Sequence, residues 1–344
     1  MIKNNKFYKT YGYIRSNYKS NYMHANGLRS LIDCLFGTVG FKHFNKKNSI
    51  KTNKINFLTF SVIPSLTNIW AWYIKNIDLY NINNIIIGDC SGGLKTSSII
   101  NHNERIPYLN YIHGEKIDFF LAHTCSTKYV VICDDDIIWT SQKPLLYALD
   151  KFKGNPKLAV VSLVPSKKKS FWLSNATKIA MGSYCIVIDR QKWISEKLSF
   201  QIHKPVGWRT YGHYLDTADH ANLELLKKDY DICIASQDIQ DLLVKFTGLS
   251  MWALRIQKSL GEINDIVRDR PDEYKKVYRV AKTLLELNKL SDDLKIINPN
   301  LFFNKSCFTK SIRLAKNKIS KSTINQINYE LRMKVEKLRN AFHY

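Results

Sequence analysis

The sequence lacks paired cysteine motifs, a signal peptide and long hydrophobic runs. Its seven cysteines are an odd number with no CxxC pair, and most lie in apolar stretches, where a free thiol behaves as a small hydrophobic side chain. This pattern indicates a reducing compartment. Residues 1–22 have no apolar core, and no run reaches the ~18 apolar residues of a membrane span. We therefore expect a cytoplasmic protein, soluble or peripheral on the inner face of a membrane.

Acidic side chains are scarce beside basic ones. In a chain of 344 residues, 29 Asp and Glu face 52 Lys and Arg, which gives a formal charge of +23. Such a balance is typical of nucleic-acid binding proteins. However, residues 1–56 carry +10 and residues 301–344 carry +8, and the 244 residues between them carry only +5. A nucleic-acid enzyme needs cations beside its chemistry, so we expect no nucleic-acid partner; basic ends suit an anionic membrane surface.

Arginine is also scarce, since it supplies only 12 of the 52 cations. The abundance of Lys, Asn and Ile is typical of an AT-rich genome, and codon bias is therefore the alternative explanation of the charge. With 45% hydrophobic residues, the chain has enough apolar material for one large domain or two modest ones. That content excludes a disordered chain.

Apolar segments in the central part of the chain alternate between strand and helix patterns. Continuous β-rich runs predict buried strands, and apolar residues at helical spacing predict helices. The predicted strands are residues 55–63, 85–87, 128–133, 158–164, 183–188 and 230–235, and the predicted helices are residues 66–80, 114–125 and 218–228. This alternation predicts an α/β fold, a Rossmann-like mixed and mostly parallel sheet flanked by helices.

Composition divides the chain into three parts. Residues 1–53 are rich in Lys, Asn and Tyr and predict a basic N-terminal extension. Residues 54–250 hold the alternating pattern and predict the catalytic domain. Residues 251–344 predict a helical, basic C-terminal region, in which residues 324–342 form an amphipathic helix. Its apolar stripe either packs within the protein or lies on a membrane surface, and the region could also form an oligomer.

Three consecutive carboxylates follow the predicted strand 128–133 directly: Asp134, Asp135 and Asp136, called the aspartate triplet below. Adjacent carboxylates repel one another unless a cation lies among them, and oxygen donors suit Mg²⁺ or Mn²⁺. Open α/β sheets bind ligands beyond the carboxyl ends of their strands, which is the predicted position of the triplet. A solvated acidic turn is the alternative.

A fourth carboxylate, Asp89, follows the predicted strand 85–87, and Gly92 and Gly93 come just after it. Asp89 could accept hydrogen bonds from a base or a ribose, and the glycines would let backbone approach a ligand. An ordinary turn explains the same residues. The significance of Asp89 therefore depends on its sharing a sheet edge with the aspartate triplet.

The residues Ser61-Val62-Ile63-Pro64, a helix, a strand reaching Asp89 with Ser91, and a strand entering the aspartate triplet follow one another in order. This order resembles the nucleotide-sugar half of a GT-A glycosyltransferase, closest to the inverting family 2, over residues 55–235. The resemblance implies a Mn²⁺ or Mg²⁺ ion held by Asp136 and Asp134. It also implies a nucleotide-sugar donor bound by Pro64, Asp89, Asp134 and Asp135.

The resemblance continues after residue 180. Gly182 and Ser183 occupy the place of the acceptor-side strand, and Trp172 and Trp208 could stack on a sugar or belong to the core. Family 2 enzymes usually carry Glu-Asp before the next helix, where a carboxylate acts as general base, but this pair is absent here. Asp216 is our first candidate for the base and Asp219 the second, because residues three apart can share a helical face. Either could instead cap that helix.

Together these features predict a metal-dependent glycosyltransferase that moves a sugar, with UDP as the expected carrier, to a hydroxyl of a surface glycan or a glycolipid, with inversion. A sugar nucleotidyltransferase is the alternative enzyme, although the usual Gly-rich loop and Lys are absent from residues 64–67. A basic protein that binds nucleic acid or another anionic surface without catalysis is the alternative from a different class.

Overall fold

The computed structural model describes residues 52–77, 82–90, 94, 103–107, 113–166, 180–200, 217–246, 248–262, 267, 271–296 and 305–341. The predicted N-terminal extension therefore lies almost wholly outside the described residues. The six cysteines among them form no disulfide with one another, and all but Cys233 are buried. Within this part of the chain, no helix has both the length and the apolar character needed to span a bilayer.

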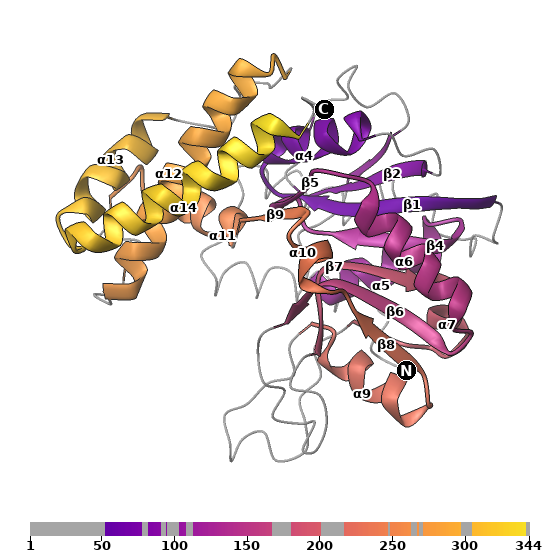
Figure 1. Ribbon diagram of the computed structural model, residues 1–344. Coiled ribbons are helices and arrows are strands. Elements are labelled where there is room, and N and C mark those ends of the chain that lie inside the picture. The colour runs from indigo at the N-terminus through magenta and orange to yellow at the C-terminus, as the bar shows by residue number, and fades with distance from the viewer. Residues whose placement is uncertain are drawn as a thin grey trace, which may run out of the picture.

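A seven-stranded sheet forms the centre of the molecule, with the strand order β3-β2-β1-β4-β7-β6-β8 (Figure 1). Six strands run parallel and β7 alone runs antiparallel, between β4 and β6. The strands are β1 Thr52–Ser61, β2 Ile82–Asp89, β3 Asn103–Pro107, β4 Thr127–Cys133, β6 Leu158–Ser166, β7 Ala180–Asp189 and β8 Asp231–Ile234. The predicted α/β fold with a mixed, mostly parallel sheet is confirmed.

Helices cover both faces of this sheet. On one face, Phe57 and Val131 pack against α4 (Pro64–Asn76) and α6 (Lys143–Gly154). On the other, Leu58 and Ile132 pack against α5 (His113–His123), α7 (Arg190–Ser195) and α9 (Asp219–Lys227). Successive strand residues point to opposite faces, so a strand covered on both sides must be apolar throughout. This is why the predicted strands read as continuous apolar runs.

Two details of the predicted elements were wrong. The first strand does not continue to Ile63; β1 ends at Ser61 and α4 begins at Pro64, two residues before the predicted start. Proline suits the first position of a helix because it has no N–H to leave unpaired and its φ is already helical. The short strands β5 (Ile137–Trp139) and β9 (Leu243–Lys245) were not predicted, and they pair antiparallel in a second, two-stranded sheet.

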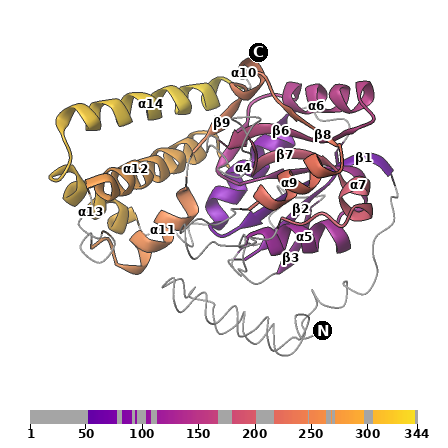
Figure 2. The same cartoon turned by 90° about the horizontal axis from the view of Figure 1, so that it is seen from below.

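The C-terminal part is helical, as predicted, and lies to one side of the sheet with α14 alongside α12 (Figure 1 and Figure 2). Its helices are α11 Leu249–Lys258, α12 Pro271–Asp293, α13 Lys305–Lys316 and α14 Lys321–Asn340. Their apolar faces form one core with Leu66, Ile69 and Tyr73 of α4. The apolar stripe of α14, including Ile327 and Leu331, is buried in this core, so it packs within the protein.

The buried hydroxyl of Tyr73 on α4 donates a hydrogen bond of 3.0 Å to the carbonyl of Leu338 on α14. Tyr73→Phe leaves that buried carbonyl without this donor, so we expect the free energy of unfolding to fall by about 1 kcal/mol. Tyr329→Phe on the same helix is the control, because Tyr329 is 58% exposed. Urea denaturation measures both variants, and equal stability of the two would show that this bond does not join α4 to α14.

Candidate functional site

An open cleft of about 750 Å³ lies at the carboxyl ends of the parallel strands β1, β4 and β6. Because β7 runs antiparallel, its first residues reach the same edge of the sheet. The cleft is lined by Phe60, Val62, His113, Lys116, Asp134, Asp135, Asp136, Ile137, Val164, Pro165, Ser166, Ser183, Tyr184, Thr217, Gln240, Lys245, Phe246, Gly248, Ser250 and Met251. All three carboxylates of the aspartate triplet therefore face one cleft at the edge where α/β sheets bind ligands.

Each carboxylate of the triplet lies next to a different helix. Asp135 Oδ2 accepts a hydrogen bond of 2.6 Å from Thr67 Oγ1 in the first turn of α4. Asp136 Oδ2 accepts from the backbone N–H of Leu249, at the start of α11, over 3.3 Å. Asp134 Oδ1 lies 3.6 Å from Nε2 of His113, the first residue of α5. The three side chains therefore point in different directions, which separates their charges.

Asp135 is the most buried of the three, with 4% of its surface exposed. Burial, opposed by the Thr67 hydrogen bond, raises the pKa of Asp135 to about 7. Thr67 is also fully buried, and its hydroxyl is hydrogen-bonded to that of Ser61 at 2.8 Å. Asp135 is therefore anchored within the protein, behind the more exposed Asp134.

Asp136 is held through both its backbone and its side chain. Its carbonyl accepts from Phe246 N over 2.8 Å, and its carboxylate lies at the amides of Gly248 and Leu249 that begin α11. Burial raises the pKa of Asp136 to about 7, and these amides act against the rise. Gly248 has φ +68, a left-handed conformation that glycine adopts without strain. The amides of Gly248 and Leu249 therefore bind the carboxylate of a residue that lies more than a hundred positions earlier in the sequence.

His113 and Lys116, both on α5, lie beside Asp134. Lys116 of α5 is 3% exposed, and its Nζ lies 4.9 Å from the centre of the Phe60 ring. Burial, followed by the neighbouring Asp136 charge, raises the pKa of Asp134, whereas Lys116 acts to lower it. The Asp134 side chain is 33% exposed, so water reaches it. Asp134 and Lys116 thus lie close enough on the wall of one cleft for an ammonium charge to favour the ionised carboxylate.

Two carboxylates of the triplet suit a divalent cation whose remaining ligands would come from a bound substrate and from water. Among the residues that the structure describes, no group of three or more His, Cys, Asp and Glu side chains is arranged as a metal cage. Mg²⁺ commonly uses only one or two carboxylates and takes its remaining ligands from phosphates and water. Asp134 and Asp136 both line the cleft and are partly exposed, which suits that open mode. Asp135 is bound to Thr67 and is less suited.

The other predicted site residues take various positions. Ser183 lines the cleft, and Gly182 lies beside it, where a Cβ would come 2.6 Å from the Tyr184 ring. Asp89 is 1% exposed and accepts from Leu94 N over 3.3 Å, and neither it nor the buried Pro64 lines the cleft. Asp219 is the first residue of α9, and its side chain lies outside the description. Asp216, Trp172 and Trp208 lie outside the described residues.

Several cleft residues were not predicted from the sequence. His113 and Lys116 lie on α5, which was predicted only as a covering helix, and Lys245 lies on the unpredicted strand β9. At the start of α5, the only sequence features that could have drawn attention to these residues were Gly114 and the spacing of His113 and Lys116, which are three positions apart. Spacing alone does not connect these residues to the triplet, because the contact depends on how α5 packs against the sheet.

No family model and no curated protein matches this sequence. Similar solved structures include a mannosyltransferase of Pyrobaculum calidifontis in complex with GDP-Man and Mn²⁺, at 12% identity and TM-score 0.36, covering 98% of this chain and 97% of that one. An active-site mutant of LgtC has 11% identity and TM-score 0.35, covering 53% and 72%. The 4-diphosphocytidyl-2C-methyl-D-erythritol synthase of Anaerococcus prevotii has 10% identity and TM-score 0.35, covering 58% and 95%.

These similar structures thus include both glycosyltransferases and a nucleotidyltransferase. At this identity and these TM-scores, neither activity nor ligands carry over to this chain. The resemblance to family 2 stays a prediction.

Thr67→Val tests the anchoring of Asp135. We expect the variant to lose about 1–3 kcal/mol of stability at pH 8, because a buried carboxylate loses its hydroxyl donor. The hydrogen bond favours the charged form, and the pKa of Asp135 is about 7, so the folded protein holds a protonated Asp135 at pH 5. The loss should therefore be smaller at pH 5 than at pH 8. Urea denaturation in EDTA at the two pH values measures this difference.

Thr309→Val is the control for this comparison, because Thr309 is exposed on α13 and its hydroxyl donates only to the Lys305 carbonyl within the same helix. Its effect should be small and equal at both pH values. A Thr67→Val loss that does not change with pH would show that Thr67 contributes packing and not a bond to the ionised Asp135.

Proposed function

We propose that this protein transfers a sugar from a nucleotide-sugar donor, with UDP as the first candidate carrier, to a hydroxyl of a glycan or glycolipid acceptor. The observation that carries the proposal is the aspartate triplet in a cleft at the carboxyl edge of a mostly parallel sheet. A cleft of about 750 Å³ lies within the ~300–1,000 Å³ range of small-molecule sites. Carboxylates alone would repel a diphosphate, so the proposal includes a divalent cation.

Asp134 and Asp136 would hold this Mn²⁺ or Mg²⁺, because both are partly exposed in the cleft. A bound cation would neutralise charge that develops on the leaving nucleoside diphosphate. Lys116 adds a positive charge of the protein's own on the same wall, where its low exposure strengthens its attraction for phosphate. The Lys116 ammonium group also lies 4.9 Å from the centre of the Phe60 ring and donates to Sγ of the buried Cys90 over 3.7 Å, so its position is fixed by contacts within the protein.

The acceptor hydroxyl must lose a proton as it attacks the anomeric carbon. We assign this proton to a carboxylate, with Asp216 first and Asp219 second, and such a base contributes typically ~10²- to 10⁴-fold. Support comes from Thr217, which lies between them in the sequence and lines the cleft. We assign Gly182 and Ser183 to the acceptor side, and the position of Ser183 in the cleft supports this proposal. Direct attack would invert the anomeric configuration.

The protein should be stabilised by UDP in the presence of Mn²⁺ and should slowly hydrolyse one member of a nucleotide-sugar panel. At a UDP concentration of 100 times its Kd, the expected stabilisation is about 2.7 kcal/mol. Asp136→Asn should abolish this Mn²⁺-dependent stabilisation, because it removes a charged ligand. Asp150→Asn is the matched control, since Asp150 is exposed on α6 and should bind as the wild type does.

The products distinguish the alternatives. Release of a nucleoside diphosphate supports the transferase, whereas pyrophosphate released from a nucleoside triphosphate and a sugar phosphate would identify a nucleotidyltransferase. Lys116→Met should weaken UDP binding and leave Mn²⁺ binding intact. If no nucleotide stabilises the protein at any Mn²⁺ concentration, the proposal fails; nucleic-acid binding that falls steeply with salt and survives Asp136→Ala would then favour the basic binding protein.

A peripheral membrane contact is the proposed role of the basic C-terminal surface. Residues 305–329 contain no Asp or Glu, and four of their five exposed cations lie in or near the turn between α13 and α14, namely Arg313, Lys316, Lys318 and Lys321. Because the apolar stripe of α14 is buried, we expect charge to be the main attraction in such a contact. Replacing these four cations by Gln should reduce binding to vesicles containing phosphatidylserine, at ~1 kcal/mol per charge near the surface. Unchanged vesicle binding would leave codon bias as the explanation.

A further inference from the structure

The third carboxylate of the triplet is fixed from behind by the helical C-terminal part of the chain. Asp136 receives one hydrogen bond on its carbonyl, from Phe246 N at 2.8 Å, and one on its carboxylate Oδ2, from Leu249 N at 3.3 Å. Phe246 directly follows β9 and Leu249 is the first residue of α11, so the two donors lie at either end of the connection between these elements. With Oδ2 directed at the Leu249 amide, the orientation of Asp136 depends on where Phe246 and Leu249 lie.

Lys334 of α14 holds that connection in place. Its Nζ donates a hydrogen bond of 2.6 Å to the carbonyl of Lys245, the last residue of β9, and lies 5.4 Å from the centre of the Phe246 ring. Lysine on a helix surface usually extends its ammonium group into water. Lys334 instead directs it at the strand end one residue before Phe246. Its ammonium group is thus joined to the backbone that donates to Asp136.

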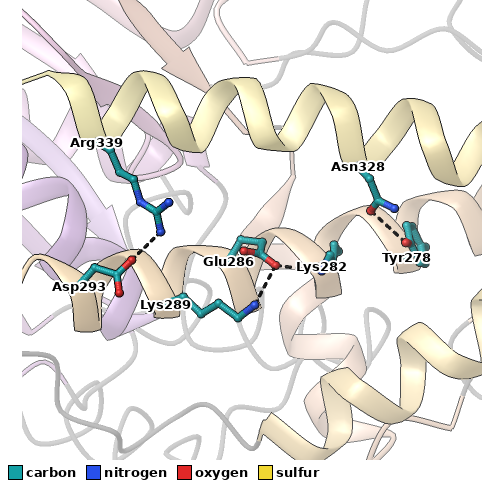
Figure 3. A network of polar contacts seen from close by, with 7 residues as sticks. All are labelled: Tyr278, Lys282, Glu286, Lys289, Asp293, Asn328 and Arg339. Carbon is teal, nitrogen blue, oxygen red and sulfur yellow. Dashed lines mark hydrogen bonds and ion pairs between the residues drawn. The ribbon is translucent and has the colours of Figure 1, made fainter.

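Helix α14 is fixed to α12 on both sides of Lys334 (Figure 3). Towards its start, Asn328 Oδ1 accepts from the hydroxyl of Tyr278 at 3.1 Å, and towards its end, Arg339 Nη2 lies 2.5 Å from Asp293 Oδ2. The carboxylate of Glu286 on α12 forms ion pairs with Lys282 and Lys289 of the same helix. The Tyr278–Asn328 and Asp293–Arg339 contacts hold α14, and with it Lys334, against α12.

The charge of Lys334 also acts on Asp136. Within the described part of the chain no ion pair involves Lys334, and the nearest acid on its own helix, Glu330, lies 3.8 Å from Arg279 of α12. Burial lowers the pKa of Lys334, whereas Glu330 and Asp136 act to raise it. The groups that face Lys334 from the neighbouring elements include Arg279 of α12 and Lys245 of β9, both cations. Asp136 is therefore the carboxylate on the site side of this ammonium group.

We propose that Lys334 is a positioning residue for Asp136: it fixes the strand end and turn whose amides orient that carboxylate towards the cleft. The role in cation binding rests on the proposed function, whereas the orientation of Asp136 does not. A partner of this kind acts on a metal through the ligand that it orients, and its loss typically weakens metal binding ~10- to 100-fold. The C-terminal helices are then part of the donor site and not a separate appendage.

Three variants of α14 test this inference. We expect Lys334→Met to weaken binding of Mn²⁺ alone by ~10- to 100-fold, as measured by the electron paramagnetic resonance of free Mn²⁺. Lys334→Arg should restore binding, because a guanidinium keeps both the charge and the donors. Arg332→Met is the matched control. It also removes one cation from α14, two residues before Lys334, but the Arg332 side chain is exposed and lies 3.9 Å from Glu336. Equal Mn²⁺ affinity of Lys334→Met and Arg332→Met would overturn the inference.

Hydrogen exchange at the Leu249 amide provides a readout that needs no metal. Exchange should be faster in Lys334→Met than in the wild type and unchanged in Arg332→Met. In an Asp136→Ala background the acceptor of the Leu249 amide is already absent, so Lys334→Met should change the exchange rate of this amide little. If Lys334→Met instead loosens α14 in general, it should raise the exchange rate as much in this background as in the wild type. Should Lys334→Met fail to fold, Lys334→Gln replaces it in both measurements.

The two failures are distinguishable. If the wild type binds no Mn²⁺, the proposed function loses its cation, and exchange at Leu249 still decides whether Lys334 positions Asp136. If the wild type binds Mn²⁺ but Leu249 exchanges at the same rate in Lys334→Met and the wild type, the positioning role is overturned and the proposed function stands.

Discussion

The arrangement of the site depends on the separation of three adjacent negative charges. Consecutive carboxylates in a partly buried turn repel one another, and burial alone raises their pKa values. In this protein each one has a different partner: the Thr67 hydroxyl on α4, the Leu249 amide on α11, and the neighbouring His113 ring on α5. The partners stabilise the separate orientations and leave Asp134 and Asp136 at the cleft. The packing of these three helices around one sheet edge is therefore what makes the triplet usable as a site.

The sheet supplies that edge through its one antiparallel strand. Parallel strands alone would bring only their carboxyl ends to the cleft, but β7 also brings the residues at its start. The Asp134 amide donates to the Tyr184 carbonyl over 2.8 Å, which joins the triplet to this strand. The aspartate triplet and Ser183 consequently lie in one cleft although they are about fifty residues apart in the sequence.

The cations of the helical C-terminal part have different structural surroundings. Its apolar faces complete a core with α4, the helix whose first turn binds Asp135. Its cations divide into two groups with different surroundings. Lys334 and Arg339 contact the protein itself, whereas the cations at the turn between α13 and α14 face solvent. The charge of +8 in residues 301–344 thus combines cations that make contacts within the protein with a basic surface that faces solvent.

The sequence by itself determined the sheet, its main strands and the position of the aspartate triplet. A strand buried on both faces must be apolar throughout, and the chemistry at its end follows directly from the next residues. Only the tertiary structure decided which groups bind those carboxylates. Thr67 lies 68 residues from Asp135, Leu249 lies 113 residues from Asp136, and Lys334 reaches a carbonyl 89 residues away. Such contacts arise from how helices pack on a sheet, and hydrophobic periodicity predicts the buried face of each helix without naming the polar residue at its end.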